Sequence, residues 1–363
     1  MTPAIPPIPP HESLLAGSAG TAETRSWWRA FCCSQGWSCL IWLGVLVLAT
    51  TGFALGCRPS KLPPLRIATN PWIGYSVFEV AETQGFFAAE GVEVHLVDQL
   101  SMSDSRRAFE QDQVDAFGCT LVEALLTQRP GRKELNLIYA IDTSHGADVL
   151  LAAADIPSVA DLKGRRVGYE PGSSDILVIC LALRRQGLSL KDVTLVPMNQ
   201  MSMREAAASR MIDAVPSFPP ACHAISELGW KVIFDSSQSP GMILDVLAVG
   251  ATSLEQRRDD WIKVIHALDR ALDYHRQRPV AAQALIAQTL QLTGKEVAES
   301  EAGILRYGLA DQRRLASTNS LLAQALDRNL SALMESGVLT NKPPQLPRVN
   351  LLGATLLQEG SVP

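Results

Sequence analysis

Short apolar runs and longer amphipathic stretches follow one another along the first half of this chain. The runs predict strands at 65–69, 92–97, 114–119 and 135–141. The stretches at 76–84, 101–111 and 120–128 carry apolar residues three or four positions apart and predict helices. Strands that alternate with helices at this spacing are typical of a parallel sheet covered on both faces.

The same pattern starts again after residue 146. It predicts strands at 147–153, 166–169, 193–197, 212–216 and 231–235, and the run 242–249 can carry the chain back to the first group. A helix through Trp261 that ends at Pro279 follows, and then helices at 280–290, 295–309 and 321–334. Segments 110–118 and 208–216 both contain a helix end, a polar break and an Asp-Ala pair before a buried strand. This similarity predicts two lobes built on one plan.

The segment 161–187 holds the most suggestive turn of the chain. Pro171 and Gly172 make a turn after the strand 166–169, Ser173 or Ser174 can cap the next helix, and Gly187 ends that helix. Free backbone N–H groups and two hydroxyls at a helix start favour an anionic or strongly polar group. The alternative is an ordinary helix cap.

Charge and cysteine content narrow the function further. The 363 residues are 47% hydrophobic and carry a formal net charge of −5, without a basic patch, so nucleic acid is not an expected partner. Cys119, Cys180 and Cys222 are far apart and have no metal-ligand spacing. We expect no metal site, no cofactor and no disulfide framework, and we expect Cys119 and Cys180 to be buried apolar residues.

The N-terminal region has the parts of an export signal. Residues 1–26 are rich in Pro, Ala and Ser, and Arg25 and Arg29 precede the apolar run 39–55, which ends at Gly56-Cys57. Residues 54–57 resemble a bacterial lipobox, which would make Cys57 the lipidated N-terminus of the mature protein. The alternative is an uncleaved membrane helix. Both interpretations place the rest of the chain outside the cytoplasm, at the periplasmic or extracellular face.

Several segments resemble the nitrate/sulfonate/taurine family of ABC-transporter substrate-binding proteins. They are RIATNPWIGYSVFEVAETQGFFAAEGVEVHLV (66–97), QDQVDAFG (111–118), DLKGRRVGYEPGSS (161–174), MIDAV (211–215) and ELGWKVIFDSS (227–237). Their order and spacing carry the resemblance, which extends from about residue 65 to Pro279.

The resemblance implies an α/β, two-lobed fold of the periplasmic-binding-protein type II. Each lobe would hold a mostly parallel sheet flanked by helices, with a helical C-terminal region. We therefore predict a leader at 1–57, a tether at 58–64, lobe 1 from 65–148 and 247–341, lobe 2 from 149–246, and a tail at 342–363. We expect a monomer that is not an enzyme and that gives a small solute to an ABC permease and its ATPase.

Two features depart from the family pattern. Ser217-Phe218-Pro219-Pro220 stands where many relatives carry an aromatic residue soon after the Asp-Ala strand. Asp175 lies in the first turn of the helix whose start would receive an anion, and a carboxylate there competes with an anion for the helix dipole. The solute could therefore be zwitterionic, cationic or neutral as well as sulfonate-, taurine- or nitrate-like, or similar to a pyrimidine precursor.

Ligands of such folds lie beyond the carboxyl ends of the strands, between the lobes. The predicted ligand-binding residues are Asn70, Trp72, Tyr75, Thr120, Tyr169, Gly172, Ser173, Ser174, Ser217, Phe218 and Asp245. Trp72 and Tyr75 could instead pack in the core. Asp245 could bind a ligand amine or be the exposed residue of an alternating strand. Asp142, His145 and Asp148 cluster after the fourth strand and could face the hinge.

Two other functions remain open at this point. One is an enzyme on the same fold, acting in pyrimidine-precursor or cofactor biosynthesis, although the leader argues against a cytosolic enzyme. The other is an extracytoplasmic sensor domain, although no kinase, cyclase or DNA-binding region follows.

Overall fold

The computed structural model describes residues 62–128, 131, 134–317 and 320–352. Residues from Pro63 onward form one compact unit. The predicted leader, Cys57, most of the tether and the end of the tail lie outside the described residues. None of the helices in the described ranges combines the length and apolar character that crossing a membrane requires.

The first sheet contains strands from both ends of this unit. Its order is β11-β4-β10-β3-β1-β2, with β12 beside β4. The strands are β1 (Leu65–Thr69), β2 (Val94–Asp98), β3 (Ala116–Thr120), β4 (Leu135–Ser144), β10 (Leu244–Gly250), β11 (Ile304–Arg306) and β12 (Arg348–Val349). We call this sheet and its helices lobe 1.

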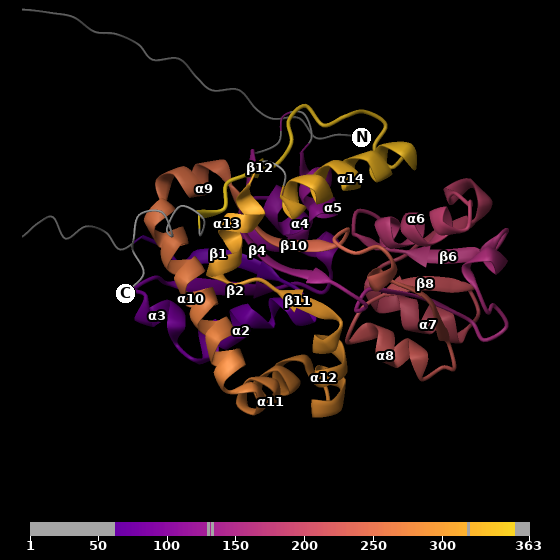
Figure 1. The fold of residues 1–363 in the computed structure, drawn as a ribbon, viewed down its shortest axis with the longest axis horizontal. Coiled ribbons are helices and arrows are strands. Elements are labelled where there is room, and N and C mark those ends of the chain that lie inside the picture. Colours follow the sequence, from indigo (N-terminus) through magenta and orange to yellow (C-terminus); the bar gives the residue numbers. More distant parts are fainter. Residues whose placement is uncertain (1–61, 129–130, 132–133, 318–319, 353–363) are drawn as a thin grey trace, which may run out of the picture. The chain divides into compact units, whose positions relative to one another are not determined.

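The second sheet contains only strands from the middle of the chain. Its order is β7-β6-β8-β5-β9. The strands are β5 (Val149–Ala152), β6 (Arg166–Tyr169), β7 (Thr194–Pro197), β8 (Ala214–Ser217) and β9 (Lys231–Asp235). We call this sheet and its helices lobe 2, and Figure 1 draws its strands β6 and β8 at the right of the view.

The helices flank the sheets and continue beyond them at the C-terminus (Figure 1). Those of lobe 1 begin with α2 (Ser76–Thr83), α3 (Phe86–Ala89), α4 (Met102–Glu110) and α5 (Leu121–Thr127). Lobe 2 has α6 (Asp175–Arg185), α7 (Met203–Ala208) and α8 (Ala221–Ser226). The C-terminal helices are α9 (Ala251–Gln256), α10 (Arg258–Gln277), α11 (Pro279–Leu290), α12 (Gly294–Ala302), α13 (Leu309–Ala316) and α14 (Leu321–Glu335).

The predicted two-lobed α/β fold is confirmed, with two corrections of detail. The sheets are mixed, because β10 runs antiparallel to β3 and β4, and β5 runs antiparallel to β8 and β9. The helix predicted over 295–309 is wrong, because α12 ends at Ala302 and residues 304–306 form β11 against β4. A three-residue strand is too short to show in the apolar periodicity.

The Asp-Ala similarity has a structural counterpart in both lobes. Asp115 accepts hydrogen bonds from the backbone N–H and the guanidinium of Arg66, at 2.9 to 3.2 Å. Asp213 accepts the same set from Arg166, at 2.9 to 3.0 Å. Each aspartate thus joins two neighbouring segments of its sheet, and the two lobes repeat one local design.

Two crossing segments join the lobes. Between β4 and β5, Gly146 N–H donates to Ser236 Oγ at 2.7 Å, and Ser144 Oγ lies 2.7 Å from the same hydroxyl. Between β9 and β10, Ser236 N–H donates to Asp148 O at 2.9 Å. The two crossings are therefore held together at Ser236.

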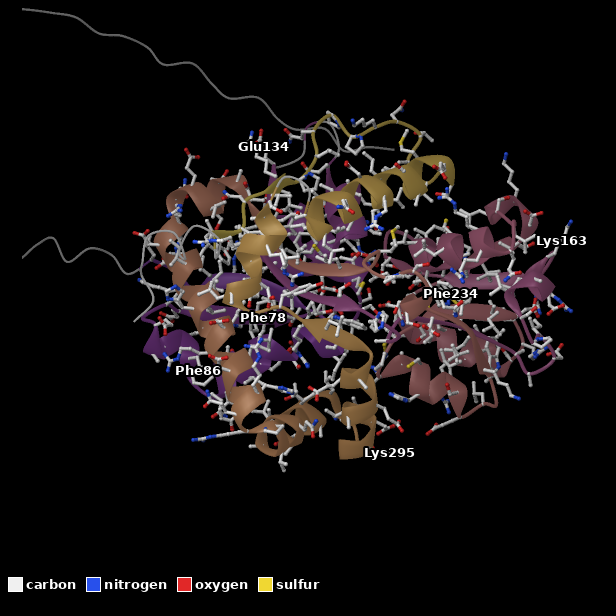
Figure 2. The ribbon with its side chains drawn as sticks, in the orientation of Figure 1. Phe78, Phe86, Glu134, Lys163, Phe234 and Lys295 are labelled. Carbon is white, nitrogen blue, oxygen red and sulfur yellow. The ribbon has the colours of Figure 1, made fainter. Side chains whose placement is uncertain are left out.

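One apolar cluster runs through both lobes, and each lobe also holds a cluster that lies mainly within it. Figure 2 shows Phe78 and Phe234 inside lobes 1 and 2 and Lys163 and Lys295 directed outward. Trp72 and Tyr75 are fully buried within the lobe 1 core. Both aromatic residues therefore pack in the core, which was the alternative to ligand binding. Their burial does not decide which polar groups they contact.

Candidate functional site

Trp72 joins both lobes at the carboxyl ends of their strands. It follows β1, and its indole Nε1–H donates to Asp142 Oδ2 in β4 at 3.3 Å. Its ring contacts the ring of Phe218, which follows β8 of lobe 2, edge to face with centroids 5.6 Å apart. The buried indole therefore spans from a carboxylate of one lobe to an aromatic ring of the other.

Tyr75 holds a second carboxylate in the same region. Its hydroxyl donates to Asp245 Oδ1 in β10 at 2.5 Å, and both side chains are fully buried. Gly118 in β3 allows this placement, because a Cβ there would lie 3.1 Å from the tyrosine ring. The local sequence of β3 thus provides the space that Tyr75 occupies.

Asp142 and Asp245 form a carboxylate pair. Their Cα atoms are register partners on adjacent strands β4 and β10. Burial raises the pKa of both, the charge of Asp142 raises the pKa of Asp245 further, and a hydrogen bond between the two side chains favours the ionised form of Asp142. These are the properties of two acids that hold one proton between them.

Arg306 is the cation whose charge acts on this pair, and its guanidinium already has other partners. Its charge lowers the pKa of Asp142. Its Nη1 forms an ion pair of 3.2 Å with Glu301, and its Nη2 donates to Ile73 O and Ser76 Oγ. Arg306 therefore does not neutralise the carboxylate pair by direct contact.

Other buried carboxyls surround the pair. Burial raises the pKa of Asp148 to about 7, and it raises the pKa of Glu123 and, well beyond its usual range, that of Asp175. The charge of Glu123 contributes to the raised pKa values of Asp245, Asp148 and Asp175. One acidic environment therefore extends across both lobes.

Five buried polar atoms in this region have no hydrogen-bond partner among the described residues, apart from the proton that Asp142 and Asp245 hold between them. They are Asn70 Nδ2, Glu123 Oε1, Asp142 Oδ1, Ser217 Oγ and Asp245 Oδ2. A buried polar group without a partner costs about 1–3 kcal/mol, so several of them in one place point to a bound polar molecule. We call Asn70, Trp72, Tyr75, Asp142, Ser217, Phe218 and Asp245 the interlobe cluster.

The other predicted ligand residues are engaged within the protein. Thr120 caps α5, and both its hydroxyl and its N–H donate to Glu123 Oε2. Ser173 Oγ donates to Glu170 O and accepts from Asp175 N–H, while Ser174 Oγ donates to Met102 Sδ without capping α6. These hydroxyls hold turns and lobe contacts in place.

The start of α6 carries one carboxylate of the chain itself, that of Asp175, and a second carboxylate, that of Glu170, precedes it. Asp175 Oδ2 accepts from Glu170 N–H at 2.8 Å, and Glu170 Oε1 accepts from Ser103 Oγ of lobe 1 at 2.5 Å. The carbonyl of Gly172 accepts from Arg106 Nε at 3.3 Å. The predicted anion-binding turn is therefore a contact between the lobes.

Tyr169 lies apart from the interlobe cluster. With Gly172 it lines a surface cavity of about 470 Å³ together with Leu126, Pro171, Ile176, Leu190, Lys191, Leu195, Ser336, Gly337 and Val338. Six of the eleven predicted residues thus belong to the interlobe cluster. Thr120 lies beside it, because its Cα is the register partner of Asp245, and the other four lie elsewhere.

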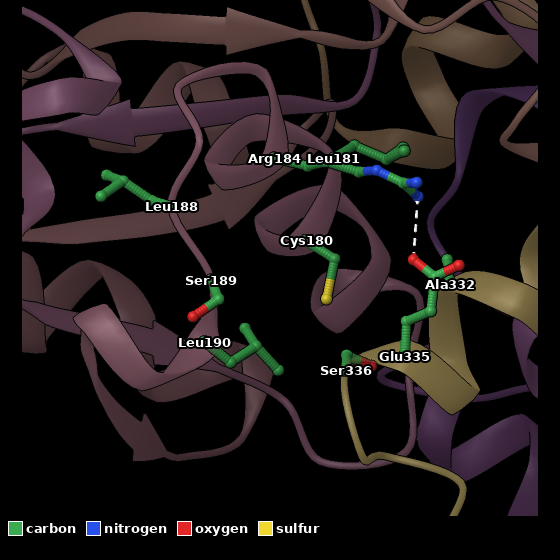
Figure 3. Close-up of a pocket in the computed structure, with 9 residues that line it drawn as sticks. All are labelled: Cys180, Leu181, Arg184, Leu188, Ser189, Leu190, Ala332, Glu335 and Ser336. Atoms are coloured by element: carbon green, nitrogen blue, oxygen red, sulfur yellow. Dashed lines mark ion pairs between the residues drawn. The ribbon is translucent and has the colours of Figure 1, made fainter.

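The cysteines of the described body are free. Cys119 is buried as expected, whereas Cys180 is half-buried and lines a cavity of about 170 Å³ between α6 and α14. Figure 3 shows this cavity beside the ion pair of Arg184 and Glu335, which are 3.2 Å apart. Burial raises the pKa of all three thiols. Within the described ranges, no group of His, Cys, Asp and Glu side chains could hold a metal ion.

Sequence reasoning did not select Asp142 as a site residue, although it noted its position after an apolar run. The only sequence signal was its place directly after the apolar run 135–141, and the structure continues that buried strand through Asp142 to Ser144. Gly74 was missed as well. A Cβ at Gly74 would lie 1.9 Å from Asp142 Oδ2 and 2.4 Å from Trp72 Nε1, so only glycine fits against this hydrogen bond.

Comparison with known proteins assigns the chain to a family. The model of the NMT1/THI5-like family matches residues 74–282, which is more than half of the chain. The chain belongs to the NMT1/THI5-like family. A relative from Brucella abortus, named "Putative binding protein", is 28% identical over 186 residues, or 49% of this chain and 57% of that protein. The NMT1/THI5-like chain thus spans little more than half of the length of that relative.

Solved structures share the fold at low sequence identity. The alkanesulfonate-binding protein SsuA from Xanthomonas axonopodis, bound to MOPS, matches with a TM-score of 0.64 at 17% identity, over 81% of this chain and 98% of that one. The nitrate-binding protein NrtA from Synechocystis matches at 0.60 and 10% identity, over 79% and 92%. The desulfurization enzyme DSZB matches at 0.58 and 19% identity, over 82% and 100%. The fold therefore occurs in binding proteins and in an enzyme.

Proposed function

We propose that this NMT1/THI5-like chain is the extracytoplasmic solute-binding component of an ABC importer. It captures a small polar organic solute between its lobes and delivers it to a permease with its ATPase. The observation that carries the proposal is the interlobe cluster, where buried polar atoms from both lobes lack partners among the described residues. A ligand that satisfies atoms of both lobes would hold the lobes together, which is the action of a solute-binding protein.

Export and membrane attachment belong to the same proposal. A component that captures solute for an importer acts outside the cytoplasm and near the permease. Lipidation at Cys57, or an uncleaved N-terminal helix, would provide that position. Replacing Cys57 with Ser should abolish lipid labelling, and attachment that persists without lipid would favour the uncleaved helix.

An enzyme on this fold is the main competing function, and no observation favours it. A nucleophilic cysteine needs a lowered pKa and access to solvent. Burial instead raises the pKa of Cys119, Cys180 and Cys222. The raised carboxyl pKa values fit general acid chemistry, but they fit a ligand-binding carboxylate pair equally well.

Native mass spectrometry tests the binding function. The chain from Pro63 onward, which contains both sheets, would be mixed with the low-molecular-weight fraction of an extract from the producing cells and freed of unbound material. We expect one small molecule retained per chain. Gly74→Ala should abolish retention because the added Cβ displaces Asp142, whereas Gly294→Ala, where no atom lies within 4 Å, should not. Failure of the wild-type chain to retain any molecule would overturn the proposal.

Delivery to a permease needs a cellular measurement. Cells that lack this chain should take up the retained molecule more slowly, and the wild-type chain should restore uptake. Uptake that is unchanged in cells without the chain would contradict a role in import while leaving solute binding in place.

A further inference from the structure

The interior between the lobes carries far more acidic than basic side chains. Six carboxyl residues are at most 5% exposed: Glu123, Asp142, Asp148, Glu170, Asp175 and Asp245. Among the described residues, Arg106 is the only basic side chain that is buried to a similar degree. It forms an ion pair with Glu110 on its own helix and donates to Gly172 O. The acidic interior therefore lacks a matching cation.

The carboxylate pair is held so that each acid offers one oxygen. Trp72 Nε1–H occupies Asp142 Oδ2, and the Tyr75 hydroxyl occupies Asp245 Oδ1. The second oxygens, Asp142 Oδ1 and Asp245 Oδ2, have no partner among the described residues apart from a proton that the two acids could share. Two fixed acceptor oxygens on adjacent strands suit a group that donates several hydrogen bonds and carries positive charge.

The other members of the interlobe cluster fit the same kind of group. The rings of Trp72 and Phe218 are in contact, and aromatic rings attract a cation that lies over their faces. Asn70 Nδ2 is a donor and Ser217 Oγ is a donor or acceptor, so they can bind polar atoms elsewhere on a small molecule. An anion is disfavoured at the start of α6, because the Asp175 carboxylate lies in the first turn of that helix.

We propose that the solute carries a cationic nitrogen, an ammonium or amidinium group, and that Asp142 and Asp245 bind this nitrogen between them. This inference rests on the proposed function, since it names the chemical class of the solute for the same site. It separates this chain from a binding protein for sulfonate or nitrate. The cation takes the place of the proton that the two acids otherwise share.

Proton release follows from that exchange. The titratable or charged groups that face the pair are Tyr75, Cys119, Glu123, Asp148, Arg306 and Tyr307. The charges of Glu123 and Asp148 raise the pKa of Asp245 and so disfavour the doubly ionised pair, whereas the hydrogen bond from Tyr75 lowers the pKa of Asp245. A bound cation compensates the negative charge of the doubly ionised pair. Cation binding should therefore release a proton at neutral pH and should strengthen as pH rises.

A set of shape-matched probes tests the sign of the charge. Benzamidine, benzamide and benzoate share one ring and differ in charge, and guanidinium and nitrate are both planar. Each would be added at low millimolar concentration to the chain from Pro63 onward, with the melting temperature and the heat of binding as readouts. We expect benzamidine or guanidinium to raise the melting temperature, and benzamide, benzoate and nitrate to leave it unchanged.

Variants assign the effect to the pair. Asp142→Asn and Asp245→Asn should each weaken binding of the cationic probe about tenfold or more. Glu79→Gln is the matched control, because burial raises the pKa of Glu79 to about 8 but its neighbours are Asp98 and Glu82. It should leave binding unchanged.

The possible outcomes separate this inference from the proposed function. The inference is overturned if benzoate or nitrate stabilises the protein. It is also overturned if neither benzamidine nor guanidinium does. Cation binding that persists in both aspartate variants overturns it as well. If native mass spectrometry still finds a retained solute, the proposed function stands in those cases. If no molecule is retained and no probe binds, both fail.

Discussion

Tyr75 donates a hydrogen bond of 2.5 Å to Asp245, although the two residues are 170 positions apart in the chain. One lies just after β1 and the other near the start of β10, so the bond ties the first strand of lobe 1 to the strand by which the chain returns to that lobe. It also fixes one oxygen of Asp245, while the other has no partner among the described residues apart from the proton that Asp245 and Asp142 hold between them. The proposed solute would therefore meet a carboxyl group that is already oriented.

Removal of the Tyr75 hydroxyl should weaken solute binding. Tyr75→Phe leaves Asp245 Oδ1 without its donor, so the carboxyl loses its orientation, and the free energy of unfolding should fall by about 1–3 kcal/mol. Tyr139→Phe is the matched control, because the buried Tyr139 hydroxyl donates to Tyr307 O at 2.9 Å. The control should lose stability but keep affinity, as measured by calorimetry. Equal affinity losses in both variants would show that stability alone governs binding.

Trp72 should affect binding through its indole N–H. Trp72→Phe keeps an aromatic ring against Phe218 but removes the donor to Asp142, and we expect the dissociation constant to rise about tenfold. Trp261→Phe is the control, since its buried indole donates to Ser253 within lobe 1. An unchanged dissociation constant in Trp72→Phe would mean that Trp72 only packs in the core.

Contact between the lobes should slow solute release. Ser103→Ala removes the hydrogen bond to Glu170 of lobe 2, so the lobes should separate more readily and the dissociation rate constant should rise several-fold. Ser105→Ala on the same helix removes only a local bond to Ser101 O. Stopped-flow measurement of solute release should show an effect for the first variant and none for the second. A larger effect of Ser105→Ala than of Ser103→Ala would mean that the bond between Ser103 and Glu170 does not hold the lobes closed.

Stability of the protein without solute should fall as pH rises from about 5 to 8. Burial raises the folded-state pKa of Asp142 and Asp148 to about 7 and that of Glu79 to about 8, so the folded state binds more protons than the unfolded state in this range. Deprotonation of Asp148 alone should lower the free energy of unfolding by about 2–3 kcal/mol between pH 5 and 8. Carboxyls with lowered pKa, such as Asp213 beside Arg166, act below this range, where stability falls as pH decreases.

Urea denaturation at several pH values would measure this dependence. Asp148→Asn should reduce the slope, because the amide does not titrate. A free energy of unfolding that rises between pH 5 and 8 would contradict the buried, uncompensated state of these carboxyls.

The fold could be predicted because its elements are regular. Apolar periodicity located β6 at 166–169 and β9 at 231–235 with their bounds, and Pro279 marked the boundary between α10 and α11. The Asp-Ala similarity indicated two lobes on one plan, and Asp115 and Asp213 occupy equivalent positions. These features depend on local sequence, which periodicity and turn residues report directly.

The site was only partly predictable, because its chemistry depends on which side chains meet across the sheet. Thr120 and Ser173 have the residue types of ligand-binding hydroxyls, yet each is engaged in a helix start or turn. Asp142 looked like one acid among several, and only the register of β4 and β10 pairs it with Asp245. The sequence contains no local signal for such a pairing.

The most direct test of solute binding in the interlobe cluster is the NMR signal of the Trp72 indole N–H, assigned with Trp72→Phe. The retained solute would be titrated into the chain from Pro63 onward. We predict a saturable shift of the Trp72 signal and no shift of the Trp261 signal, because the Trp72 indole donates to Asp142 whereas the Trp261 indole donates to Ser253. An unchanged Trp72 signal at a solute concentration that saturates the protein would contradict binding at this site.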